Sequence, residues 1–137
     1  MTATIESSIW LGFRRRLETF TTFRPFDIAW PGEIYSPSNR LFLTPTITFA
    51  RPEKVTLSQK PSLRKGIFMV RVAAPLGAAS EVALQVASEI GQFFPADLPL
   101  RFNQIRFKVE GDAEVVGGYR DDGFWNVPVK INWQAFA

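Results

Sequence analysis

The chain has 137 residues, a net charge of +3, no cysteine and no histidine. Its length fits one domain spanning residues 1–137, and its 46% hydrophobic content is ordinary for a folded protein. Without cysteine or histidine there is no disulfide, no thiolate metal site and no common general base. We therefore expect no cofactor and no metal. Enzymes are disfavoured, although carboxylate, lysine or tyrosine chemistry stays open.

The first residues lack the basic start and apolar core of a signal peptide. No apolar run approaches the roughly 20 residues that cross a bilayer. We therefore expect no membrane partner, and a protein that is made and used in a cytoplasm or in something assembled there.

Residues 4–20 are predicted to form an amphipathic helix. Ile5, Ile9, Phe13 and Leu17 recur every four residues and form one apolar stripe. The three arginines at positions 14–16 are interpreted as a solvated face of this helix. Proline at position 25 ends the helix, because the residue before a proline is pushed out of helical geometry.

Two strands are predicted next, over residues 26–30 and 41–49. In the first, apolar and other residues alternate, as in a half-buried strand. The second is rich in threonine and contains Pro45. Because proline cannot donate a ladder hydrogen bond, Pro45 predicts an edge strand or a bulge.

Residues 51–65 form the most polar stretch and carry five basic residues against one acid, Glu53. We predict a long hairpin or a partly mobile arm that leads into a central strand over residues 66–73. The arm is solvated, docks on a protein, or contacts a nucleic acid. The last alternative is the weakest, since the stretch lacks the interleaved aromatic residues of single-strand binders. The basic residues are Arg51, Lys54, Lys60, Arg64 and Lys65.

The second half predicts a helix over residues 79–93 and then three strands. These strands lie near residues 105–110, 115–116 and 127–135, and Asp121-Asp122-Gly123 is predicted to form the last hairpin turn. The predicted fold class is α+β, with two helices packed on a mainly antiparallel, twisted β-sheet.

The carboxylates and glycines of this half offer weak candidate sites. Asp121 and Asp122 suit a solvated turn better than a metal site. Residues 110–114, with three alternating acids, are interpreted as a solvated loop. Gly77 precedes a helix, but no lysine and serine or threonine follow it as in a phosphate-binding loop.

The aromatic residues are more numerous than a small core needs, with four tryptophans and thirteen phenylalanines. Those that face solvent are expected to mark protein interfaces, where aromatic side chains are enriched. The best candidates lie near predicted loops: Phe26, Trp30, Phe42 and Trp125.

Three stretches of the chain form an ordered set of motifs. They are Ile-Ala-Trp-Pro-Gly at 28–32, the Arg-Lys-Gly strand and Pro-Leu-Gly turn at 64–77, and Asp-Asp-Gly-Phe-Trp-Asn-Val-Pro-Val-Lys-Ile at 121–131. Taken in order, they resemble the tail-terminator-like family of long-tailed bacteriophages and prophages. The family usually has asparagine where this chain has Gly32, and it lacks so long a basic arm.

The resemblance implies a structural role without catalytic residues. Such proteins form a homo-hexameric ring that caps the tail tube and offers a surface to the head-side connector. The implied partners are copies of the chain itself, the tube protein and the connector. The implied location is the tail or neck of the virion, with the host cytoplasm as the place of assembly.

Two other functions stay open. One is a different head–tail connector or neck protein of the same particle, which the protein that co-purifies would reveal. The other is a small nucleic-acid-binding module, whose binding should fall steeply with salt; we do not expect nucleic acid to be a specific ligand.

Overall fold

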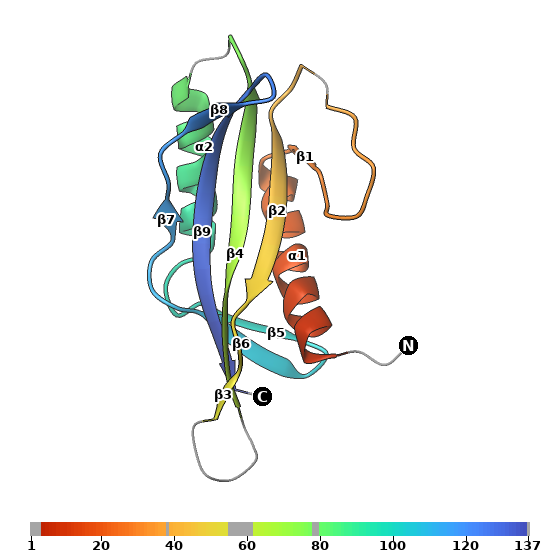
Figure 1. The fold of residues 1–137 in the computed structure, drawn as a ribbon, viewed down its shortest axis with the longest axis vertical. Helices are drawn as coiled ribbons and strands as arrows, with labels where there is room; N and C mark the ends of the chain where they lie inside the picture. Colours follow the sequence, from red (N-terminus) through yellow and green to blue (C-terminus); the bar gives the residue numbers. More distant parts are fainter. Residues whose placement is uncertain (1–3, 38, 55–61, 78–79, 137) are drawn as a thin grey trace.

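Two helices lie on one side of a curled β-sheet in the computed structural model, which describes residues 4–37, 39–54, 62–77 and 80–136 (Figure 1). Neither helix in these ranges is long and apolar enough to span a membrane. The elements in chain order are α1 (Ile5–Phe23), β1 (Asp27–Ile28), β2 (Phe42–Phe49), β3 (Glu53–Lys54), β4 (Ser62–Pro75), α2 (Ser80–Phe93), β5 (Pro99–Phe102), β6 (Ile105–Val109), β7 (Glu114–Val115), β8 (Tyr119–Asp121) and β9 (Phe124–Phe136).

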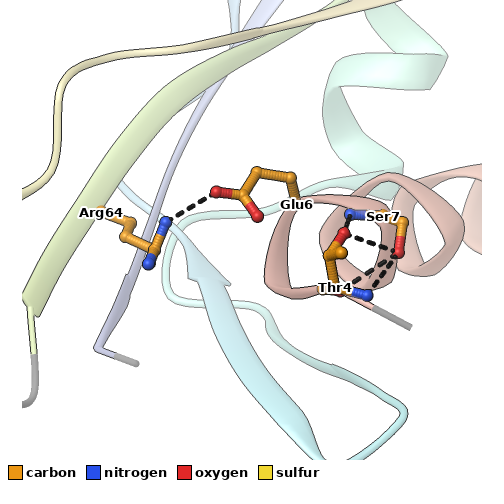
Figure 2. Close-up of polar contacts among 4 residues, drawn as sticks. All are labelled: Thr4, Glu6, Ser7 and Arg64. Carbon is orange, nitrogen blue, oxygen red and sulfur yellow. Dashed lines mark hydrogen bonds and ion pairs between the residues drawn. The ribbon is translucent and has the colours of Figure 1, made fainter. Parts of the chain in front are cut away.

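The first helix, α1, forms where its four-residue repeat predicts it. Thr4 caps its start: its Oγ1 accepts from the Ser7 amide at 3.1 Å, while the Thr4 amide donates to Ser7 Oγ at 3.0 Å (Figure 2). Ile9, Phe13 and Leu17 are fully buried, as the stripe predicts. The helix ends at Phe23, three residues later than expected, just before Pro25.

The prediction that the arginines of α1 form a solvated face holds only for Arg15, which is exposed. Arg14 and Arg16 are half-buried, and each of the three lies over an aromatic ring. Planar guanidinium groups stack on aromatic faces with a favourable cation–π energy. Arg16 also donates from Nε and Nη2 to the carbonyl oxygen of Phe93, at 3.1 and 2.7 Å, and its burial lowers its pKa. The arginines thereby fasten α1 to distant elements. The stacked pairs are Arg14–Trp30, Arg15–Phe102 and Arg16–Phe93.

The sheet follows the order β1-β2-β4-β9-β6-β5, with β3 beside β4 and with β7 and β8 beside β9. The α+β class is correct, but the sheet is mixed and curled into a half-barrel rather than mainly antiparallel and twisted. It is mixed because β1 pairs with β2 in parallel. The long connection from 29 to 41 makes this possible, since a tight hairpin allows only antiparallel pairing. The curl brings β5 and β6 against α1, while β9 and β4 carry α2.

Strand β2 lies at one side of this sheet, as Pro45 predicts. It pairs with β4 in continuous register from Phe42 opposite Ala73 to Phe49 opposite Gly66, so there is no bulge. On its other side, β1 reaches only Phe42 and Leu43. Pro45 therefore lies at a position where its missing N–H removes no hydrogen bond between the described strands.

Two tight hairpins turn at residues with positive φ. Asp122 and Gly123 have φ of 48° and 78°, which confirms the predicted turn between β8 and β9. Asn103 and Gln104, with φ of 49° and 67°, join β5 to β6 in the same way. Both turns have the backbone conformation of a two-residue hairpin loop. The strands β5 and β8 escaped prediction because they are only four and three residues long.

The core lies between the two helices and the inner face of the sheet. Phe13 of α1 stacks on Phe68 of β4, with ring centroids 4.5 Å apart and planes 12° apart. The second helix buries Ala83, Val86 and Ile90, while Val82 on the same helix is exposed. The outer face of β2, β4 and β9 carries no helix within the described ranges (Figure 1).

Candidate docking surfaces

The free side of β2 has the character of a surface that a partner covers. From Phe42 to Phe49 the strand contains no charged residue, and beyond Leu43 no described strand pairs with its outer side. Natural edge strands are usually protected by charges, bulges or covering elements, and here Pro45 supplies only partial protection. At its end, Phe49 is 43% exposed. This edge offers backbone hydrogen-bonding groups and apolar side chains together.

A groove of about 560 Å³ runs beside this edge, between β2 and the first turns of α1. Trp10 of its wall is half-buried and meets Trp30 edge-to-face, with ring centroids 6.0 Å apart. Apolar pockets with few polar groups commonly hold ligands or partner side chains. The lining residues are Thr4, Glu6, Ser7, Trp10, Pro31, Thr46, Ile47 and Phe49.

The base of the predicted basic arm lies at the end of β2 and of this groove. Glu53 and Lys54 pair with Leu63 and Ser62, which confirms a hairpin (β3–β4) whose described part projects past β2 at the bottom of the view (Figure 1). Arg64 Nη1 donates to Glu6 Oε1 at 2.8 Å and so ties the hairpin to the start of α1 (Figure 2). The sequence does not reveal this ion pair, because its partners are 58 positions apart.

The five basic candidates of this arm differ in how exposed they are to a partner. Arg51 and Lys65 are exposed. Arg64 is half-buried and committed to Glu6. Lys54 is placed in β3 by its backbone, and Lys60 lies outside the described residues.

The aromatic candidates are held mostly within the molecule. Trp30 is half-buried beneath the Arg14 guanidinium, and Trp125 is half-buried with its ring against Gly118. Phe42 is only 6% exposed, because the rings of Tyr35 and Phe124 enclose it at centroid distances of 4.9 and 5.2 Å. Phe42 is therefore removed from the candidate surface.

The opposite side of the sheet presents different chemistry. There α2, β7 and the chain between them border a crevice of about 410 Å³ lined by Ser88, Gly91, Gln92, Pro95, Ala96, Asp112, Ala113 and Val115. Of the three acids at positions 110–114, Asp112 lines this crevice and is exposed, as predicted for a solvated loop. Glu110 is half-buried, and Glu114 lies in β7 opposite Lys130. This crevice was not predicted, since α2 and β7 are joined only by the tertiary fold.

The ion pair at the hairpin base is expected to make a small, measurable contribution to stability. Reversing Arg64 to glutamate should cost about 1 kcal/mol, the upper end for a partly exposed pair, because it places two carboxylates together. The double variant Glu6→Arg with Arg64→Glu should recover most of this loss. Urea unfolding measures both changes. Lys65→Glu, at an exposed neighbouring position, is the control; an equal loss there would contradict a specific role for Arg64.

Comparison with known proteins shows which family the chain resembles. The model of a family described as phage tail terminator protein matches residues 8–133. The chain belongs to this family. The match includes both helices' core faces and most of the sheet, and it confirms the resemblance found in the sequence.

The solved structures support the fold. Four of their chains match, and one of them covers 95% of this chain and 94% of its own length, with a TM-score of 0.76 and 23% sequence identity. At that sequence identity, the similarity is evidence for the fold only. No curated protein matches the chain.

Family membership makes the chain a structural protein of the phage tail, located in the tail of the virion and in contact with other tail proteins. The family is not known to be enzymatic. The docking surfaces, rather than a catalytic pocket, are therefore the features to explain.

Proposed function

We propose that this chain is a ring-forming tail terminator. In this proposal six copies close into a ring on the end of the finished tail tube, stop its growth and provide the joining surface for the head-side connector. The observation that carries the proposal is the family match over residues 8–133, nearly the whole chain. In the same proposal the chain acts as one domain over residues 1–137.

The geometry of the sheet suits a ring. A ring requires a heterologous contact, in which two different surfaces of the same protein meet and the rotation closes. The uncharged side of β2 and the acidic side near β7 are such a pair, on opposite sides of the sheet (Figure 1). A contact between them leaves the ends of the molecule free for the tube and the connector.

The β3–β4 hairpin supports a second contact, with a neighbouring copy or with the tube. The hairpin lies at one end of the molecule's long axis (Figure 1). Exposed Arg51 just before β3 and exposed Lys65 in β4 give it positive charge. The Glu6–Arg64 ion pair at 2.8 Å sets the position of the hairpin base. Lys54 and Lys60 are proposed to add their positive charges to this contact. Half-buried Trp30 and Trp125 stay proposed interface residues outside the hairpin, since Trp125 pairs with Ala74 at the other end of β4.

Deleting residues 53–62 is expected to abolish assembly without unfolding the protein. The deletion removes the outer hairpin and leaves β4 from Leu63 onward paired with β9, so the core residues keep their contacts. Sedimentation velocity, together with an assay of tube capping, measures the outcome. A deletion variant that assembles and caps tubes normally would exclude this role of the hairpin.

The ring itself is tested first by sedimentation velocity of the intact protein across concentration, with and without magnesium. A species near six times 15.5 kDa supports the ring.

If the protein stays monomeric, purified tubes are added, because a tube end can act as the template. Tubes that grow unchanged in the presence of the protein, with no protein at their ends, would contradict the proposal. Co-purification with the connector and not with tubes would instead favour a neck protein.

A further inference from the structure

We infer that neighbouring copies in the ring meet through the β2 side of one copy and the β7 side of the next, with Ile34 of the first seated in the crevice between α2 and β7 of the second. This inference rests on the proposed ring and names the contact that closes it. It is carried by a fully exposed apolar side chain between anchored neighbours on one side of the molecule, and by a crevice lined mostly by small or apolar residues on the other.

Ile34 is fully exposed, although the loop that carries it is anchored on both sides. Before it, the Glu33 amide donates to the Trp30 carbonyl at 3.1 Å, and Glu33 Oε1 lies 3.6 Å from Arg14 Nη2. After it, the Tyr35 hydroxyl donates to Asp27 Oδ2 at 3.2 Å. Burial and the nearby Asp27 carboxylate raise the pKa of Tyr35, as expected for a hydroxyl held in place.

This arrangement resembles the anchor of a protein interface. An apolar side chain on a flexible loop loses backbone and side-chain entropy when it docks, whereas one on an anchored loop loses less. Residues that dominate binding energy are typically such side chains, fitted into a pocket of the partner. Ile34 is the side chain here that is both fully exposed and flanked by anchored neighbours.

The crevice between α2 and β7 has the size and lining that an isoleucine needs. Its volume is about 410 Å³, and small or apolar residues form most of its wall. Gly91 has no side chain, so the surface of α2 is recessed there. A Cβ added at this position would lie 3.4 Å from the Cβ of Ala113. Ala96 is exposed at the mouth, while Ala113 and Val115 are half-buried inside.

The charges on the two sides are complementary. Asp112 is the charged residue in the lining of the crevice, and Glu110 and Glu114 lie two positions to either side of it, with Lys130 opposite Glu114. The β2 side carries exposed Arg40 just before the strand and exposed Arg51 just after it, whereas Glu33 beside Ile34 faces Arg14. Opposite charges across an interface fix its register and disfavour wrong partners.

The occupant is a second copy because the two surfaces cannot meet within one chain. The Ile34 loop extends from the β1–β2 side of the sheet, and β7 pairs on the far side of β9 (Figure 1). Repeating such a contact from copy to copy is heterologous, as a ring requires. The same contact also covers the uncharged edge of β2, which is otherwise open to unwanted strand pairing.

The absence of cysteine from the chain makes a disulfide test clean. A variant carrying both Ile34→Cys and Ala96→Cys is assembled, alone or on tube ends, and mildly oxidised. We expect a ladder of disulfide-linked multimers that reaches the size of the ring, and no ladder from either single variant. The matched control combines Thr22→Cys with Ala96→Cys, since Thr22 is also exposed, on α1, but lies outside the Ile34 loop. It should give no ladder.

A second measurement uses a charge at the anchor. Ile34→Asp should weaken assembly by about 10- to 100-fold, the loss expected when one buried isoleucine is replaced by a charge. Its urea midpoint should be unchanged, because Ile34 is fully exposed in the single chain. Phe23→Asp, at another exposed apolar position, should assemble normally.

The outcomes separate this inference from the proposed function. Rings that form without a ladder and tolerate Ile34→Asp would overturn this contact and leave the tail-terminator function standing. Rings in which Ile34→Cys links to the tube protein would overturn it in favour of the tube as the occupant. Failure to form rings or cap tubes, even for the unaltered protein, would count against the proposed function itself.

Discussion

Replacing Phe13 by alanine is expected to lower the free energy of unfolding by about 3–5 kcal/mol, the usual loss for a fully buried phenylalanine. Phe13 is 0% exposed at the centre of the core. Its ring stacks on Phe68 at 4.5 Å and approaches Phe107 at 5.1 Å. The truncation therefore leaves a cavity between α1 and two strands of a rigid sheet, which cannot collapse to fill it.

Urea unfolding followed by circular dichroism measures this loss as a lower midpoint with an unchanged slope. The matched control is Phe23→Ala on the same helix, where the ring is 71% exposed. That substitution should change stability by no more than about 0.5 kcal/mol. Equal losses at the two positions would contradict the assignment of Phe13 to the core.

Replacing Gly66 by alanine is expected to cost about 3 kcal/mol or more, the upper range for overpacking, although only one methyl group is added. Gly66 lies in β4, the strand between β2 and β9, opposite Phe49 and Trp133. A Cβ at this position would overlap the carbonyl oxygen of Thr48 and lie 2.5 Å from Trp133 Cζ2. The Thr48 oxygen belongs to the backbone, so β2 would have to separate from β4.

Gly117→Ala is the matched control, because a Cβ at Gly117 meets no heavy atom within 4 Å. Its stability should stay within about 0.5 kcal/mol of the unaltered protein. If Gly66→Ala is tolerated equally well, the close approach of β2, β4 and β9 at this point is incorrect. Because the end of β2 borders the proposed docking groove, a damaged Gly66 variant should also assemble poorly.

The candidate docking surfaces were only partly predictable from the sequence. The basic residues of the arm and the hairpin that carries them were predictable, because composition and strand signals are local. The role of Arg64 was not, since Glu6 is brought to it only when α1 packs beside β4. Ile34 was present in the sequence as an apolar residue between turn-forming neighbours, which is a signal that could have been noticed. Its full exposure depends on how the fold holds Glu33 and Tyr35.

The sequence by itself determined the helices, the long strands, the α+β class and, through ordered motifs, the tail-terminator family. The helices, the strands and the fold class follow from the spacing of apolar residues and from turn chemistry, which act over a few neighbouring positions. The family follows instead from the resemblance of the motifs. Only the tertiary structure decided the parallel pairing of β1, the curl of the sheet, the burial of Phe42 and the crevice beside β7. Each of these depends on which distant segments pack together, and short strands such as β1 and β7 carry too few residues to encode their partners.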